Sequence, residues 1–280
     1  MNKTCVLCNR IPKKFYRENY CGNCYNKGIE TGYIERKIKK YDPIEKDFSE
    51  EQRNVLIGLM LGDGSLTKLK DGKNSRLSVL RGAKDKEYLL ENLNTFKEYC
   101  GDNPIYYRKI KNPRLAELNK CSDPDRYYES YSFNTRSSKF FTNFRKEWYP
   151  NNIKIVPKTL QDLSALTIAI WLADDGSISE YRKNKLSIIF NTNGFVKDDT
   201  LYLINLLEMK FGKGFICKLK GDKNKQQYII VCYDILARKI CDYIDDVFPK
   251  SMTRKSNIWR NVENFNSNMY IPTISKKNTN

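Results

Sequence analysis

The chain has 280 residues, enough for one large domain, or for two small ones with an additional module. It carries 50 Lys and Arg against 33 Asp and Glu, and its 40% hydrophobic content excludes a largely disordered chain. Because it contains no histidine, Ser–His and Cys–His nucleophiles are excluded. The net charge of +17 indicates a polyanionic partner, and nucleic acid is the one we expect. No membrane span is expected, because the longest apolar stretch, residues 166–173, is far shorter than roughly 20 residues.

The first cysteines of the chain form two Cys-x2-Cys pairs: Cys5, Cys8, Cys21 and Cys24. Two such pairs allow four thiolates to converge tetrahedrally on one Zn²⁺. A segment this short cannot bury a core, so metal binding would supply most of its folding free energy. Two disulfides or a redox pair are the alternatives, and disulfides fit poorly with a polar start that lacks a signal peptide's apolar core. We expect a zinc-binding module over residues 1–30 and a basic linker over residues 31–48.

The remaining sequence repeats one pattern, over residues 49–157 and 158–280. Each copy is predicted to contain a helix, two strands, a helix, two strands and a helix. In the first copy these elements are expected near residues 50–62, 65–70, 76–81, 87–101, 104–110, 127–135 and 138–150. In the second they are expected near residues 164–175, 177–182, 185–191, 200–212, 214–220, 227–234 and 236–249. The matched order predicts a duplicated α+β domain with pseudo-twofold symmetry.

The opening helix of each copy ends in an acidic residue followed by glycine. The first helix begins at a capping box, residues 49–52, and ends at Gly-Asp-Gly, residues 62–64, where Gly64 is expected to form a left-handed cap. The second begins near Asp162 or Ser164 and ends at Asp-Asp-Gly, residues 174–176. The macrodipole is negative at a helix C-terminus, so two acidic residues placed there indicate a nearby cation.

Small residues one turn apart lie on both helices, as Gly58 and Gly62 and as Ala169 and Ala173. Such spacing lets two helices approach closely and brings their terminal carboxylates together. Paired carboxylates without histidine form an oxygen-rich site suited to Mg²⁺. The alternative is a pair of ordinary core helices closed by Asp-Gly turns.

The sequences LIGLMLGDG (56–64) and IAIWLADDG (168–176) resemble the two motifs of a monomeric LAGLIDADG homing endonuclease. Residues 148–177 are also similar to the stretch that enters the second motif. The resemblance implies an αββαββα fold in each half, with two saddle-shaped antiparallel sheets that lie in the DNA major groove. It also implies Mg²⁺-dependent cleavage of both strands of a long target, with Mn²⁺ or Ca²⁺ as substitutes and short 3′ overhangs. The cysteine module resembles the additional finger of some mobile-element endonucleases.

The resemblance assigns roles to individual acidic residues. The metal-binding carboxylates of the family correspond to Asp63 and Asp175. Gly62 and Asp174 occupy the preceding motif position, where we expect a secondary contribution to Mg²⁺ binding.

The family also places a basic residue in the loop after the third helix of each half, here Lys154 and Lys255. Either lysine would stabilise negative charge on the scissile phosphate or polarise the attacking water. Arg81 and Asn191 end the second strand of each half and are expected to order active-site water.

The strand segments alternate between residues that face the helices and residues that face solvent. On a basic sheet the solvent-facing set would read base edges, while loop lysines would contact phosphates. The DNA-contacting residues that we expect are Lys68, Lys70, Arg76, Arg108, Lys109, Lys218 and Lys220.

Two other functions are compatible with this sequence. An RNA-binding maturase that folds its host group I intron would use the same fold and basic surface. A noncatalytic DNA-binding regulator is the second alternative, against which the retained Asp63, Asp175, Lys154 and Lys255 argue. The abundance of Lys, Asn, Ile and Tyr is typical of AT-rich coding DNA. We therefore expect a mobile element of a bacterial or phage-infected cytoplasm or of an organelle.

Overall fold

The computed structural model describes residues 15–16, 20–21, 23–24, 26–27, 44, 46–68, 72–111, 127–221 and 227–262. The chain divides into two units, residues 1–43 and 44–280. In the first unit, β1 (Phe15–Tyr16) pairs antiparallel with β2 (Tyr20–Cys21). Cys5 and Cys8 lie outside the described residues, so the zinc module stays a prediction.

The second unit contains the expected order of elements twice. The first half consists of α2 (Glu50–Leu61), β3 (Ser65–Lys68), β4 (Ser75–Gly82), α3 (Lys86–Thr95), β5 (Ile105–Lys111), β6 (Tyr127–Asn134) and α5 (Lys139–Trp148). The second half consists of α6 (Ala165–Asp175), β7 (Gly176–Arg182), β8 (Lys185–Asn191), α7 (Lys197–Phe211), β9 (Ile216–Lys220), β10 (Gln227–Tyr233) and α8 (Asp234–Ile244). A further helix, α9 (Thr253–Arg260), was not predicted from the sequence.

Two antiparallel four-stranded sheets share one topology, with strand orders β3-β4-β6-β5 and β7-β8-β10-β9. In β4, Leu77 and Val79 are buried in the core with residues of α3 and α5, whereas the alternating Leu80 is 51% exposed. In β8, Ile188 and Phe190 are buried in the same way. Each sheet therefore has a helix-covered face and an opposite face, which we call its open face. The α+β prediction is confirmed.

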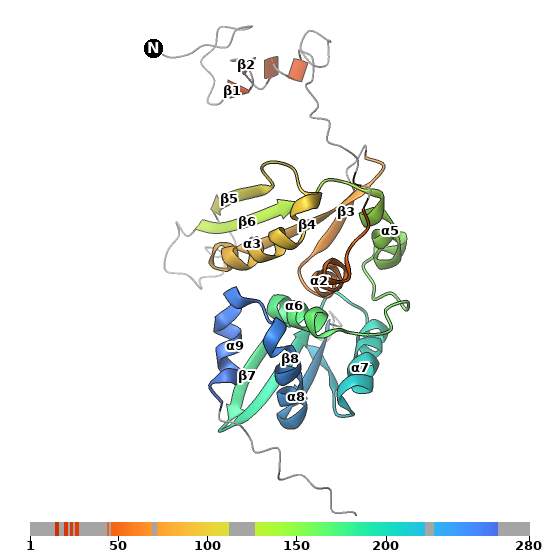
Figure 1. Ribbon diagram of the computed structural model, residues 1–280, viewed down its shortest axis with the longest axis vertical. Helices are drawn as coiled ribbons and strands as arrows, with labels where there is room; N and C mark the ends of the chain where they lie inside the picture. Colours follow the sequence, from red (N-terminus) through yellow and green to blue (C-terminus); the bar gives the residue numbers. More distant parts are fainter. Residues whose placement is uncertain are drawn as a thin grey trace, which may run out of the picture. The chain divides into compact units, whose positions relative to one another are not determined.

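The helices α2 and α6 lie side by side between the two sheets (Figure 1). An ideal Cβ built on Gly58 would lie 2.6 Å from the Cβ of Ile170, and one on Gly62 would collide with the Cβ of Asp174. The predicted close approach is confirmed. However, the atoms nearest the two glycines belong to Thr167, Ile170 and Asp174 rather than to Ala169 and Ala173. A glycine on one helix leaves room for a full side chain on the other, so small residues are required on one side only.

The helix starts agree with the sequence, whereas the predicted cap at Gly64 is wrong. Ser49 Oγ accepts from Gln52 N at 3.1 Å and Ser49 N donates to Gln52 Oε1 at 3.0 Å. In the second half Ser164, not Asp162, caps α6. Gly64 has no positive φ; instead its N–H donates to Leu59 O at 2.7 Å, and a Cβ there would lie 2.8 Å from that oxygen. Glycine is needed because the chain turns back tightly against α2.

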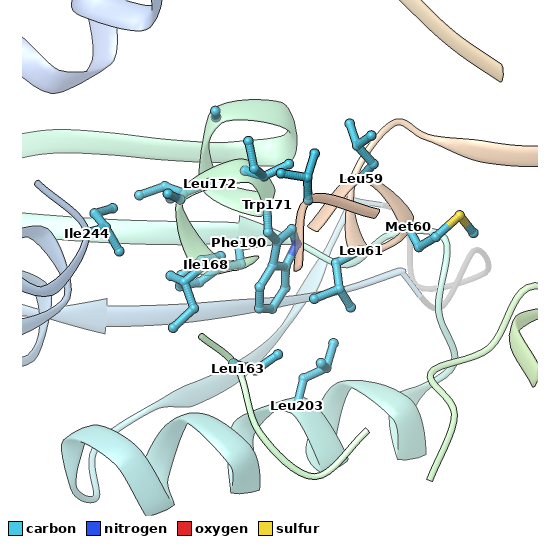
Figure 2. Packing of buried hydrophobic residues seen from close by; sticks show 14 of the residues in the cluster. Leu59, Met60, Leu61, Leu163, Ile168, Trp171, Leu172, Phe190, Leu203 and Ile244 are labelled. Atoms are coloured by element: carbon cyan, nitrogen blue, oxygen red, sulfur yellow. The ribbon is translucent and has the colours of Figure 1, made fainter. Parts of the chain in front are cut away.

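The core extends from the helix pair into both sheets. Trp171 packs on Phe190 with ring centroids 4.3 Å apart, beside Leu61 and Leu163 (Figure 2). This burial fixes the rotation of α6 and therefore the direction in which its acidic end points. None of the helices within the described ranges is both long and apolar enough to cross a membrane.

We predict that Gly58→Ala lowers the free energy of unfolding by about 1–3 kcal/mol, because the added methyl group overpacks the contact with Ile170. Urea denaturation measures the change. Gly194→Ala is the matched control, since a Cβ there meets nothing within 4 Å, and it should change stability by less than about 0.5 kcal/mol. Equal stability of the two variants would contradict close packing at Gly58.

Candidate active site at the ends of α2 and α6

The structure brings the acidic ends of both motifs together. Asp63 directly follows the last turn of α2, and Asp175 is the last residue of α6. The Asp63 N–H donates to Asp174 Oδ2 at 3.0 Å, across the boundary between the two halves. The Asp63 side chain is 48% exposed, whereas that of Asp174 has no exposed surface. One carboxylate of this pair is therefore available to a ligand and the other is not.

Arg81, near the end of β4, joins these two carboxylates. Its Nη1 lies 3.1 Å from Asp63 Oδ2 and its Nη2 lies 2.6 Å from Asp174 Oδ1. Only 4% of the guanidinium side chain is exposed. Its Nε is buried and has no hydrogen-bond partner among the described residues. Arg81 thus joins the two carboxylates through its Nη atoms, and its expected role in ordering water stays a prediction.

Tyr88 of α3 is a component of the site that the sequence did not indicate. Its hydroxyl donates to Asp174 Oδ1 at 2.8 Å, and its ring lies 5.2 Å from the Arg81 guanidinium carbon. Tyr88 belongs to no recognisable motif, and 86 positions separate it from Asp174. Only the tertiary packing of α3 against the second half reveals the contact.

Lys154 and Lys255 both bind carbonyls at the helix ends, a contact that the sequence did not predict. Lys154 Nζ donates to Gly62 O at 3.1 Å and to Gly64 O at 3.2 Å. Gly62, an expected secondary metal residue, therefore shares its carbonyl with a lysine. Burial is the main cause that lowers the pKa of Lys154 to about 8. Lys154 still carries its charge at neutral pH and faces the negative end of the α2 macrodipole.

Lys255 occupies the corresponding place in the second half. Its Nζ donates to the carbonyls of Leu172, Ala173 and Gly176 at 2.9, 2.7 and 2.7 Å. Burial is also the main cause that lowers the pKa of Lys255 to about 8. The expectation that Lys255 lies in a loop is wrong, because it belongs to α9. The helix holds its ammonium group rigidly against α6, and three short bonds use all three of its hydrogens.

Asn191 ends β8, but it does not take the place that Arg81 has in the first half, because it lies on the open face of its sheet whereas Arg81 alternates with the buried Leu77 and Val79. Its Nδ2 donates to the backbone oxygen of Asp175 at 2.6 Å, and its Oδ1 accepts from Lys220 at 2.7 Å. The two halves therefore differ, since an arginine contacts side chains in one and an amide contacts the backbone in the other. Asn191 also links the acidic site to the open face of the second sheet, where Lys220 lies.

Three carboxylates are balanced by three cationic side chains in this site. Burial, followed by the charges of Asp63 and Asp174, raises the pKa of Asp175 to about 6. Among the described residues, no group of three or more Cys, Asp or Glu side chains forms a complete metal cage. Mg²⁺ commonly uses one or two carboxylates and takes its other ligands from phosphates and water. Asp63 and Asp175 fit that pattern, because mutually repelling carboxylates at a partly open site gain most from a cation.

The expected DNA-contacting residues divide between the two faces of the sheets. Arg76 and Arg108 lie on the open face of the first sheet, in register with Thr67 and Ser130. Lys218 and Lys220 lie on the open face of the second sheet, where Lys218 donates to the Tyr233 hydroxyl at 2.8 Å.

The remaining basic residues of that set are placed differently. Lys109 lies on the other face of the first sheet and pairs with Glu129 at 2.7 Å. Lys68 is opposite the buried Ser75, at the edge of the helix-covered face. Lys70 lies outside the described residues. Of this set, only Lys218 and Lys220 share the open face of the second sheet with Asn191.

Residues 53–234 match the sequence pattern of the LAGLIDADG DNA endonuclease family. The chain belongs to this family. Both acidic helix ends of this LAGLIDADG protein lie within the matched residues, and so do Arg81, Tyr88 and Lys154. Lys255 lies beyond them.

Several curated proteins are similar to this LAGLIDADG protein. The cytochrome b mRNA maturase bI2 of Saccharomyces cerevisiae is 30% identical over 214 residues, which cover 68% of this chain and 44% of the maturase. The chain therefore spans less than half the length of that relative. The maturase bI2 of Debaryomyces hansenii is 28% identical, and the match covers 74% of this chain and 76% of that maturase. The probable intron-encoded endonuclease 1 of Wickerhamomyces canadensis is 29% identical, and the match covers 70% of this chain and 80% of that protein.

A solved structure also matches the fold. The homing endonuclease I-WcaI, bound to its DNA recognition sequence, is 25% identical and superposes with a TM-score of 0.62. The match covers 75% of this chain and 88% of that one.

The raised pKa of Asp175 predicts a gain in stability when its charge is removed. Between about pH 4 and pH 6 the folded protein binds more protons than the unfolded chain, so stability falls as pH rises through this window. We expect Asp175→Asn to raise the Tm of the metal-free protein by about 2–4 °C at pH 8, and by less at pH 4.

Calorimetry at both pH values measures this difference. Asp246→Asn, at an exposed position, is the control and should leave the Tm unchanged. If Asp175→Asn lowered the Tm at pH 8, the Asp175 carboxylate would be stabilising, contrary to the predicted cost of its burial and of the neighbouring carboxylates.

Proposed function

We propose that this protein is a site-specific endonuclease that cuts both strands of a long DNA target and leaves short 3′ overhangs. One observation carries the proposal: each half delivers one carboxylate, Asp63 or Asp175, to the same boundary between α2 and α6. Two related halves match the two strands of a duplex, so a single molecule would cut both. The family match and the similarity to a DNA-bound homing endonuclease support this function.

Asp63 and Asp175 would hold Mg²⁺, for which Mn²⁺ or Ca²⁺ would substitute in binding. When bound, Mg²⁺ supplies Lewis-acid stabilisation of charge and an acidified water for phosphodiester hydrolysis. Asp63 remains half-exposed and Asp175 half-buried, so their carboxylates are the site's accessible oxygen ligands.

The basic residues would act on the phosphate and on water. The Lys154 ammonium group donates to two carbonyls and lies 5.6 Å from the Phe195 ring centroid, and its charge would stabilise the scissile phosphate. Lys255 keeps a fixed positive charge behind Asp175. Arg81 and the amide of Asn191 would help to order active-site water.

The open faces of the two sheets would lie in the major groove. Arg76 and Arg108 on the first sheet and Lys218 and Lys220 on the second are the candidates for guanine contacts. Lys68 and Lys109, which lie off these faces, would contribute phosphate contacts only. Each neutralised phosphate would add about 0.9 to the slope of log affinity against log salt.

The test is cleavage of a randomised duplex library with Mg²⁺, followed by sequencing of the ends. We expect one long motif and short 3′ overhangs. Asp63→Asn and Asp175→Asn should each reduce cutting by more than about 100-fold, since outer-shell substitutions typically cost 10–100-fold. Asp246→Asn should cut normally. Motif-specific binding without cleavage by the unmodified protein would instead indicate a DNA-binding regulator.

An RNA maturase is the second candidate function, and the two relatives named cytochrome b mRNA maturase favour it. The same basic surface would hold a folded intron. Competition between a structured group I intron RNA and duplex DNA distinguishes the two functions. Tighter binding to the RNA at equal salt, without DNA cleavage, would support the maturase, whereas cleavage of a defined duplex would support the endonuclease.

We also propose that Cys5, Cys8, Cys21 and Cys24 bind one Zn²⁺ that folds the N-terminal unit. The antiparallel pair of β1 and β2 ends at Cys21 and supports this proposal, because such a hairpin places a cysteine at its edge. We predict one Zn²⁺ per chain by elemental analysis, with loss of the metal in Cys24→Ser.

Cys217→Ser on β9 is the control for the zinc prediction and should retain the metal. Purified protein without zinc, or zinc retained by Cys24→Ser, would refute the site.

A further inference from the structure

We propose that Asp174, together with Tyr88 and Arg81, is a positioning unit through which the second half fixes the geometry of Asp63. Asp174 would then act on the metal site indirectly and not as a Mg²⁺ ligand. The consequence for cleavage rests on the proposed endonuclease function, whereas the positioning itself does not.

Within the described part of the chain, every hydrogen-bond donor to the Asp174 carboxylate comes from the first half. Oδ1 accepts from Arg81 Nη2 at 2.6 Å and from Tyr88 Oη at 2.8 Å, and Oδ2 accepts from Asp63 N at 3.0 Å. The Asp174 side chain has no exposed surface. A metal ion would have to displace charge-assisted or buried bonds to reach it, and these are the stronger hydrogen bonds in proteins. Both carboxylate oxygens of Asp174 are therefore already hydrogen-bonded to other residues.

The unit holds Asp63 at two points. Asp174 accepts from the Asp63 backbone, and Arg81, held by Asp174, also contacts the Asp63 carboxylate. In contrast, no described residue donates a hydrogen bond to the carboxylate of Asp175, and Asn191 contacts only its backbone oxygen. The unit therefore orients one of the two catalytic carboxylates.

The motif position just before the metal-binding aspartate explains why there is only one such unit. Gly62 fills this position in α2 and Asp174 fills it in α6. A Cβ on Gly62 would collide with the Cβ of Asp174, so only one helix can place a side chain there. The Asp174 side chain of the second half therefore fills the space between the two helices that the equivalent residue of the first half, Gly62, leaves open.

Contacts on both sides of Tyr88 tie α3 to the second half. Arg254 Nη2 lies 3.0 Å from Asp85 Oδ1, just before α3, and Glu91 Oε1 accepts from Ser251 N at 2.9 Å. Tyr88 lies between these two anchoring points. A displacement of one half relative to the other would move Tyr88 and Arg81 against Asp174 and would disturb Asp63.

The first test uses the metal-free protein, labelled with ¹⁵N-Asp and deuterated for NMR. A hydrogen bond to a charged carboxylate deshields an amide proton, so we expect Asp174→Asn to shift the Asp63 amide upfield. Tyr88→Phe should shift it in the same direction by a smaller amount. The amide of Asp175 should be unaffected by Tyr88→Phe.

Tyr99→Phe is the matched control. Tyr99 is also buried, but its single hydroxyl hydrogen is shared among Lys46 O, Asp47 O and Gln52 Oε1, at the start of α2 and away from the site. It should leave the Asp63 amide in place. An unchanged Asp63 signal in both site variants, or an equal shift in Tyr99→Phe, would overturn the proposal. Asp174→Asn leaves Arg81 partly unpaired and could prevent folding. If Asp174→Asn does not fold, the shift measured in Tyr88→Phe decides the test.

The second test separates positioning from ligation. Mn²⁺ titration of Asp174→Asn should still broaden the Asp63 and Asp175 signals if Asp174 is a positioning residue. Loss of this broadening in folded Asp174→Asn would instead make Asp174 a ligand and overturn the proposal.

The third test measures the rate of cutting of each strand on the selected DNA target. Tyr88→Phe should slow one strand about 10–100-fold relative to the other, and Tyr99→Phe should leave the ratio unchanged. An unchanged ratio for Tyr88→Phe would overturn the coupling to cleavage. Absence of cleavage by the unmodified protein would refute the endonuclease function, while the NMR shifts would still decide the positioning.

Discussion

The close packing of α2 against α6 controls the geometry of everything around it. Gly58 and Gly62 remove side-chain volume from one helix, so the opposing face of the other helix can carry Ile170 and Asp174. The two acidic helix ends then meet, and the two sheets extend away from them with their open faces accessible. A wider separation of the helices would remove the shared site even if both sheets remained folded, because no other pair of elements carries both carboxylates.

Three carboxylates at the ends of α2 and α6 would repel one another strongly if no cationic groups lay nearby. Arg81 neutralises part of the charge of Asp63 and Asp174, while Lys154 and Lys255 bind carbonyls at the helix ends. Burial, and then the charges of the neighbouring carboxylates, raise the pKa of Asp175 to about 6. This uncompensated charge lowers stability in the metal-free protein and would be relieved by a bound cation. The same arrangement therefore links a stability cost to the proposed metal site.

The sequence predicted what depends on local pattern or on the repeat. Helix periodicity, the Ser49 cap and the duplicated order gave the elements of both halves, and the motifs located Asp63 and Asp175. It did not predict α9, which follows the last repeat element, or the role of Tyr88, whose partner is 86 residues away. The prediction for Gly64 was wrong because the sequence alone does not distinguish a glycine required by close backbone approach from one required by a positive φ. The basic strand residues could not be sorted by face until the register was known.

We propose that one carboxylate from each half, Asp63 and Asp175, binds divalent metal at the boundary between α2 and α6, while Asp174 positions Asp63. Anomalous diffraction from Mn²⁺-soaked crystals of the protein with its selected DNA target tests this most directly. We predict anomalous peaks within ligand distance of the Asp63 and Asp175 carboxylates and none within that distance of the Asp174 carboxylate. Peaks elsewhere on the protein, or a peak coordinated by Asp174 in place of Asp63, would contradict the account.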